Sequence, residues 1–136
     1  MKMMVYISLF ILLIATSCGS SGSNNSDSEN KTATLAWNFT TQYDDMDIPH
    51  TTVVLMVDNK QTVVAENALG EFTVMDKSQY ASYNIPENTL EACQGGWAGL
   101  VSFYIVVSEN NKLVVKEGFT DEGIATPEFK NHITIN

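Results

Sequence analysis

Apolar residues alternate with polar ones through much of the chain, and this period of two is typical of β-strands that bury one face. Segments 51–57 (TTVVLMV) and 61–66 (QTVVAE) have this pattern and flank the polar triplet Asp58-Asn59-Lys60. Asp and Asn tolerate the positive φ angles of tight turns. The three segments together therefore predict a β-hairpin.

A second hairpin is predicted from segments 100–108 (LVSFYIVVS) and 112–117 (KLVVKE), which flank Glu109-Asn110-Asn111. Tyr104 and Val106 point to one face of the first strand. Four further apolar residues point to its other face: Val101, Phe103, Ile105 and Val107. This strand is therefore expected to be covered on both faces, or to lie near the middle of a sheet.

Six or seven short strands and at most one short helix are expected in all. Pro86 at the first position of PENTLEA favours a helix at 86–92. Further strand candidates are 33–40, 71–75 and 132–135. These elements predict an all-β fold, either an antiparallel β-sandwich or a small closed β-barrel. The sandwich is favoured because the long interruption at 76–96 bridges two sheets more easily than it continues a regular meander.

The first 18 residues follow a different pattern. Lys2 precedes an apolar run of 13 residues, and Thr16-Ser17 then lead to Cys18. The run is too short to span a bilayer, which takes about 20 residues, and the order of the parts is typical of a secretory signal. With a cysteine at the cleavage point, it resembles the signal sequence of bacterial lipoproteins, although Ala15 stands where that pattern usually has leucine.

The resemblance covers residues 1–18 alone. It implies that residues 1–17 are removed as a signal peptide and that Cys18 carries fatty acyl chains such as palmitate, which anchor the protein in the membrane of the cell envelope. Residues 18–31 are then expected to form a flexible linker, because no apolar side chain occurs from Gly19 to Lys31. Residues 32–136 are predicted to form a single domain with one core.

The charge of the chain narrows its possible partners. The formal net charge is −9, all seven basic residues are lysines, and removal of residues 1–17 leaves −10. Nucleic acid is not an expected partner, because phosphate and base contacts need clustered Lys or Arg. A basic partner or a hard cation is compatible with the charge, although acidity can also serve only to keep an exported protein soluble.

No catalytic motif is present. The sequence has no HExxH, no GxSxG and no Gly-rich phosphate loop, and its two histidines, His50 and His132, are far apart. With Cys18 acylated, Cys93 has no disulfide partner. Because no Lys, Arg or His stands beside it, Cys93 is predicted to be a small buried apolar side chain. We expect no enzymatic activity and no cofactor.

The acidic cluster Asp44, Asp45 and Asp47, followed by His50, is the best candidate for cation binding, because calcium prefers oxygen ligands on a flexible loop. Ile48-Pro49 interrupt the ligand spacing of an EF-hand, however. The cluster is therefore predicted to be a solvated turn whose aspartates accept hydrogen bonds from nearby backbone amides.

Tyr80, Tyr83 and Trp97 are the candidate binding residues. Exposed rings would offer a platform for a sugar or a protein partner. Trp97 begins the most apolar strand, so it is predicted to be a core residue that fills the space between the sheets. For Tyr80 and Tyr83 a core position and a surface position are both possible. Gly95-Gly96, just before Trp97, predict a bulge or a close approach of two backbones.

Three hypotheses for the function follow. The first is a lipid-anchored envelope module that binds a protein or glycan through loops of its β scaffold, and the linker, the single domain and the missing catalytic motifs favour it. The second is a β-barrel inhibitor or small-ligand carrier, which would need an internal cavity. The third is a structural subunit of an envelope assembly, which would expose an apolar patch or an unpaired strand edge.

Overall fold

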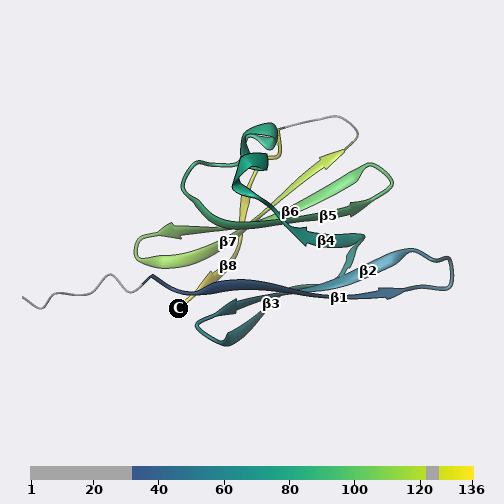
Figure 1. Cartoon of the computed structure of the whole chain (residues 1–136), viewed down its shortest axis with the longest axis horizontal. Helices are drawn as coiled ribbons and strands as arrows, with labels where there is room; N and C mark the ends of the chain where they lie inside the picture. The colour runs from purple at the N-terminus through teal and green to yellow at the C-terminus, as the bar shows by residue number, and fades with distance from the viewer. Residues whose placement is uncertain (1–31, 122–125) are drawn as a thin grey trace, which may run out of the picture. The chain divides into compact units, whose positions relative to one another are not determined.

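Two antiparallel sheets pack face to face in a computed structural model that describes residues 32–121 and 126–136 (Figure 1). The predictions for the signal sequence, Cys18 and the linker lie outside these residues. One sheet has the strand order β1-β2-β3, the other β4-β5-β6-β7-β8, and the two do not close into a barrel. The strands are β1 Leu35–Tyr43, β2 Pro49–Val57, β3 Lys60–Leu69, β4 Glu71–Val74, β5 Thr89–Trp97, β6 Leu100–Glu109, β7 Lys112–Asp121 and β8 Lys130–Ile135. The predicted all-β sandwich is confirmed.

Both predicted hairpins are confirmed, and a further hairpin with a two-residue turn was missed. Asp58-Asn59 join β2 to β3 with φ angles of 47° and 67°, and Asn110-Asn111 join β6 to β7 with 52° and 60°. Left-handed angles at both central residues match the twist of the flanking strands. The missed hairpin joins β5 to β6 through Ala98-Gly99, at φ angles of 54° and 85°. Alanine is rare at positive φ, so the residues of this turn carry little signal for a hairpin.

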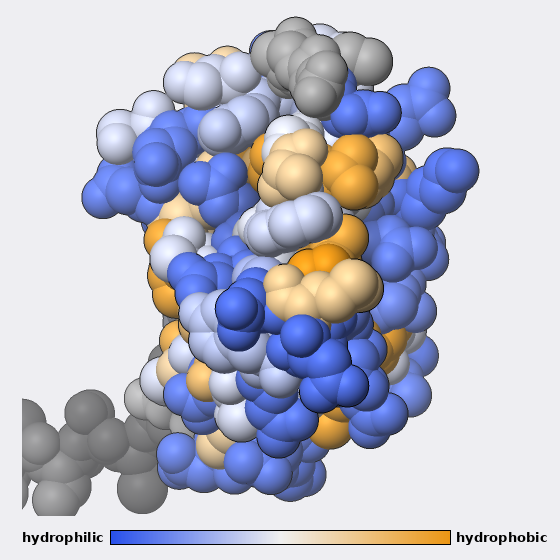
Figure 2. Space-filling model, turned by 90° about the vertical axis from the view of Figure 1, so that its right-hand side faces the viewer, coloured by the Kyte–Doolittle hydropathy of each residue, from blue (hydrophilic) through white to orange (hydrophobic). Residues whose placement is uncertain are grey.

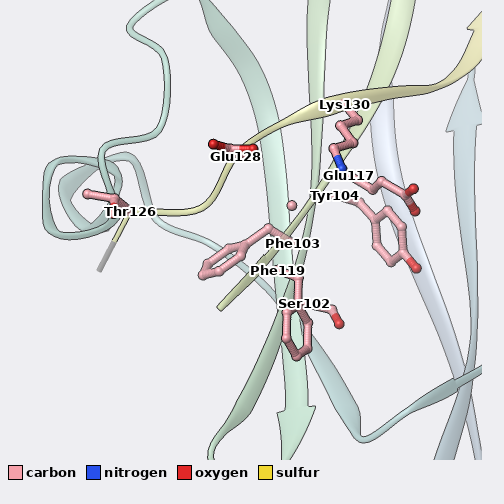
Figure 3. A pocket seen from close by; sticks show the side chains of 9 residues that line it. Ser102, Phe103, Tyr104, Glu117, Phe119, Thr126, Glu128 and Lys130 are labelled. Atoms are coloured by element: carbon pink, nitrogen blue, oxygen red, sulfur yellow. The ribbon is translucent and has the colours of Figure 1, made fainter. Parts of the chain in front are cut away.

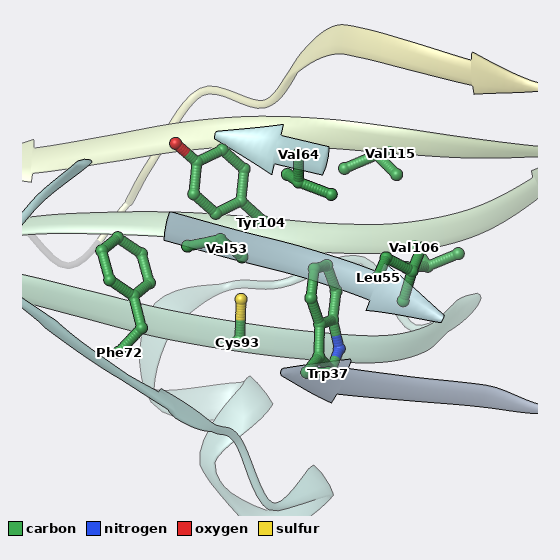
Figure 4. Close-up of a cluster of buried hydrophobic side chains, with 9 residues drawn as sticks. All are labelled: Trp37, Val53, Leu55, Val64, Phe72, Cys93, Tyr104, Val106 and Val115. Atoms are coloured by element: carbon green, nitrogen blue, oxygen red, sulfur yellow. The ribbon is translucent and has the colours of Figure 1, made fainter. Parts of the chain in front are cut away.

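β6 is the central strand of the five-stranded sheet and is covered on both faces, as predicted. Its inner face, toward the three-stranded sheet, contributes Tyr104 and Val106 to an inner cluster with Trp37, Val53, Leu55, Val64, Phe72, Cys93 and Val115 (Figure 4). Its outer face contributes to an outer cluster of Met75, Tyr80, Ile85, Ala92, Phe103, Ile105, Val107 and Val114. The core is therefore built in two layers on either side of this sheet.

The predicted helix at 86–92 is wrong. Residues 86–88 form a turn and β5 begins at Thr89, while a 3-10 helix, η1, spans Lys77–Tyr83. Asp76 caps this helix: its carboxylate accepts from Ser78 N at 2.8 Å, and its own N–H donates to Gln79 Oε1 at 2.9 Å. Proline is favourable in the first turn of a helix and also in a β-turn. Here the residues that follow Pro86 pair with β4 and β6 as strand β5, so the proline stands in a β-turn.

The segment 76–96 does not bridge the two sheets. It joins neighbouring strands of the five-stranded sheet and brings η1 over the outer face. The single residue Gly70 makes the crossover instead, between β3 and β4, at a φ of 103° that favours glycine. The close approach predicted at Gly95-Gly96 occurs here, since a Cβ on Gly70 would lie 2.3 Å from the Gly96 carbonyl carbon.

Tyr80 belongs to the outer cluster and is 9% exposed, so it is a core residue and not part of a surface platform. Its hydroxyl oxygen is buried and has no hydrogen-bond partner among the described residues. Burial also raises the pKa of this hydroxyl above its ordinary value. The ring therefore contributes to stability through its apolar area, and the hydroxyl contributes nothing by bonding.

We expect Tyr80→Ala to lower the free energy of unfolding by about 3–5 kcal/mol, as for other large buried rings. Tyr80→Phe keeps the ring and loses no hydrogen bond, so its effect should be below about 1 kcal/mol in either direction. Urea denaturation of both variants measures this. If Tyr80→Phe cost as much as Tyr80→Ala, the hydroxyl would have to make a bond in the folded protein.

Candidate functional site

The two ends of the sandwich carry different residues. The loop end consists of the β1–β2 turn (44–48), Gly70, the β5–β6 turn (98–99) and the last residues of β7, and it lies on the right in Figure 1. The N-terminal end holds the start of β1 and the β2–β3 and β6–β7 turns, on the left. Thr32 therefore joins the domain at the end opposite to the loop end.

Exposed apolar side chains gather at the loop end. Of the eight large exposed hydrophobic residues in the described part of the chain, five lie here and form what we call the loop-end patch: Tyr43, Met46, Leu69, Trp97 and Phe119. Met46 is 75% exposed, Phe119 55% and Trp97 44%. Figure 2 looks onto this end and shows a band of hydrophobic side chains between hydrophilic ones. Exposed apolar groups that cluster in this way mark interaction sites more often than scattered ones do.

The prediction that Trp97 fills the core is wrong, and its position in β5 explains why. Trp97 pairs with Leu100 and Phe119 with Ser102, and both rings lie on the same side of the sheet as the inner cluster. The ring of Phe72, which belongs to the inner cluster, has its centroid 6.3 Å from that of Phe39 in the other sheet. Trp97 lies nearer to the loop end than Phe72, and Phe119 lies on β7, three strands away from β4. There both side chains are exposed although they point inward.

Tyr83 and Trp97 line one shallow depression, and Tyr80 does not. The depression has a volume of about 370 Å³, with Gly95-Gly96 among its lining residues. Three polar residues from β4 and β5 also line it: Glu71, Thr73 and Gln94. Tyr83 itself is half-buried, with its ring centroid 4.9 Å from that of Phe103. The structure thus brings together two of the three predicted aromatic residues.

A second hollow opens where β8 parts from β7, and Figure 3 shows its lining. It has a volume of about 550 Å³ and is lined by Ser102, Phe103, Tyr104, Glu117, Gly118, Phe119, Thr126, Glu128 and Lys130. Phe119 of the loop-end patch thus lies at the edge of this hollow. Sequence reasoning missed Phe119 and Met46, although each is a single apolar residue in a polar segment (EGFTDE and DDMD), which is a sign of a surface position.

The acidic segment is a turn built around Asp44. One carboxylate oxygen of Asp44 accepts from the backbone N–H of Met46 at 2.9 Å and of Ile48 at 3.0 Å. The other oxygen lies 3.2 Å from His50 Nε2. These contacts confirm the predicted turn for Asp44. Within residues 32–121 and 126–136, no group of three or more His, Cys, Asp or Glu side chains is arranged to hold a metal ion.

Carboxylates surround the loop-end patch. Asp44, Asp45 and Asp47 flank Met46, while Asp121 pairs with Leu100 across the β6–β7 ladder. Glu71 accepts a hydrogen bond from the Tyr43 hydroxyl, and this bond and the charge of Glu71 raise the pKa of Tyr43. In the part of the chain that the structure describes, Lys130 is the one lysine near the patch, since it lines the same hollow as Phe119 and pairs with Glu117. The others lie elsewhere: Lys60 and Lys112 beside the turns of the N-terminal end, Lys77 on η1, and Lys116 paired with Glu109.

Cys93 and His132 are held by contacts within the fold. Cys93 is a free and fully buried thiol, as predicted, and burial raises its pKa well above the ordinary value. His132 has Nε2 at 2.6 Å from the Val64 carbonyl oxygen and Nδ1 at 3.3 Å from the Glu117 carboxylate. Among the described residues, no hydrogen bond joins either histidine to Cys93 or to a serine.

No known family model, curated protein or solved structure matches the chain. In residues 32–121 and 126–136 there is also no helix with the length and apolar character needed to cross a bilayer.

We expect Asp44→Ala to lower the melting temperature at neutral pH, because two turn amides lose their acceptor. Hydrogen bonds from Ile48 and Met46 hold the pKa of Asp44 below its ordinary value of 3.8. The ionised carboxylate therefore stabilises the fold above that value, and its contribution is lost as the pH falls through the lowered pKa. The melting temperatures of variant and parent should converge on acidification.

Asp45→Ala is the matched control, because no hydrogen bond to the Asp45 side chain occurs among the described residues. Its melting temperature should follow that of the parent at every pH. A difference between parent and Asp44→Ala that persisted in strong acid would contradict the assigned role of the carboxylate.

Proposed function

We propose that this chain is a lipid-anchored protein of the cell envelope whose loop end binds a protein partner. The observation that carries the proposal is the position of the loop-end patch: five exposed apolar side chains gather at the end of the domain opposite to Thr32. A patch at that end stays accessible when the chain is anchored through residues that precede Thr32.

The composition of the patch favours a protein partner. Tyr43 and Trp97 are of the residue types that most often dominate binding energy at protein interfaces, because they combine a large apolar area with a polar group. Met46 adds a flexible side chain that adapts to an opposing surface. The hollows that Trp97 and Phe119 line are open to solvent, so the patch suits a broad contact better than the enclosure of a small molecule.

The anchor contributes a second element. A linker of the length of residues 18–31 has a root-mean-square reach of roughly 20 Å if it behaves as a random coil. A domain held in this way keeps its rotational freedom while its distance from the membrane is limited. It can therefore search for a partner fixed in the envelope at a high effective concentration.

A glycan is the second candidate, and the depression beside Tyr83 and Trp97 favours it. Glu71, Thr73 and Gln94 offer hydrogen-bonding groups in the depression that Tyr83 and Trp97 also line. The ligand-carrier alternative has no support of this kind, because the sheets stay open and the inner cluster occupies the space between them. A structural role in an envelope assembly would use the same loop-end patch.

The anchor is tested by Cys18→Ser. We expect this variant to move from the membrane to the soluble fraction of the cell, and mass spectrometry of the parent protein to find Cys18 acylated at a new N-terminus. An unprocessed parent chain with an unmodified sulfur would contradict the lipid anchor.

The loop end is tested by Trp97→Ser combined with Phe119→Ser. We expect the double variant to lose at least about 90% of the protein partner that the parent chain captures from envelope extract, since central aromatic residues often carry 2 kcal/mol or more each. The matched control is Val63→Ser with Leu90→Ser, which removes exposed apolar side chains outside the patch. Equal loss in both double variants would contradict a specific role of the loop end.

A further inference from the structure

The charge around the loop-end patch bears on the kind of partner that fits it. Five carboxylates surround the patch: Asp44, Asp45, Asp47, Glu71 and Asp121. Only Asp44 has a basic side chain within ion-pair distance in the described part of the chain, and that side chain is His50. The negative charge at this end is therefore largely uncompensated within the domain.

The turn geometry keeps these charges beside the apolar side chains. Asp44 is held by two backbone amides, and Glu71 accepts from the hydroxyl of Tyr43, which is itself a member of the patch. Asp45 and Asp47 are the direct neighbours of Met46 in sequence. An apolar centre and an acidic rim are thus parts of one surface.

Such a surface selects its partner by charge. A second copy would place like charges opposite each other, and anionic lipid or nucleic acid would be repelled in the same way. A partner with lysine or arginine around an apolar contact would instead pair with the rim while its centre covers the aromatic rings. Complementary charge of this kind raises the rate of association and excludes other partners.

We propose that the loop end is a docking surface for a basic protein, with its apolar centre on Trp97, Phe119 and Met46 and its lysine or arginine side chains on the acidic rim. This inference rests on the proposed function and adds the chemical class of the partner. The rim, and not the overall charge of the chain, provides the selectivity.

The test uses the full acylated chain in non-ionic detergent and three sets of immobilised peptides. The first set combines tyrosine and leucine with lysine, the second has glutamate in place of each lysine, and the third has serine there. We expect retention on the lysine set alone, weaker by at least about tenfold when the ionic strength rises from about 0.05 M to about 0.5 M.

Charge variants separate the rim from the net charge. Asp45→Asn with Asp47→Asn and Asp121→Asn should weaken retention on the lysine set about tenfold. The matched control removes as many charges elsewhere, by Glu87→Gln with Glu91→Gln and Glu109→Gln, and should bind as the parent does. Equal weakening in both triple variants would overturn the proposal, because any acidic surface would then suffice.

The remaining outcomes separate this inference from the proposed function. The parent chain could instead be retained on the glutamate or serine peptides, with this retention lost in Trp97→Ser with Phe119→Ser. The loop end would then still be a binding site, but the proposal of a basic partner would be refuted. If that double variant bound every peptide set as the parent does, or if no set retained the parent chain, both proposals would fail.

Discussion

The architecture depends on the close approach of two glycines. Gly70 carries the chain from one sheet to the other within a single residue, and its φ of 103° and its contact with Gly96 leave no room for a side chain. Its N–H donates to the Pro49 carbonyl at 2.8 Å, and its carbonyl accepts from the buried hydroxyl of Thr51 at 2.6 Å. The N–H and the carbonyl of the crossover residue are thereby both bonded to β2, and these bonds hold the start of β4 beside the three-stranded sheet.

The loop-end patch combines side chains from the ends of both sheets. Trp97 and Phe119 occupy inward-facing positions at the loop end of β5 and β7, so they have the orientation of core residues and the exposure of surface residues. Tyr43 reaches this area from the other sheet through its hydrogen bond to Glu71. A rigid scaffold thus presents large rings with little conformational freedom, which lowers the entropy that a partner has to overcome on binding.

The sequence predicted those parts of the fold that depend on local chemistry. The hairpins at Asp58-Asn59 and Asn110-Asn111 were found because Asp and Asn at positive φ determine a turn without reference to the rest of the chain. The helix expected from Pro86 was wrong, because the pairing of β5 with its neighbouring strands determines the structure of that segment. The burial expected for Trp97 was wrong, because its exposure depends on the position of the end of β5 relative to the other sheet. Of the aromatic candidates, Tyr83 and Trp97 line one depression, whereas Tyr80 is a core residue. The sequence around Tyr80 and Tyr83 is polar in both cases and does not show this difference.

The burial of Cys93 has a consequence for the chemistry of the domain. Its sulfur lies in the inner cluster with Phe72 and Tyr104, without exposed area. Burial raises the pKa of this thiol and so disfavours the thiolate that alkylating and oxidising reagents require. Reagents can reach this sulfur only when the two sheets separate. The rate at which Cys93 is labelled therefore measures how often the sandwich opens, and the residue is an internal reporter of kinetic stability.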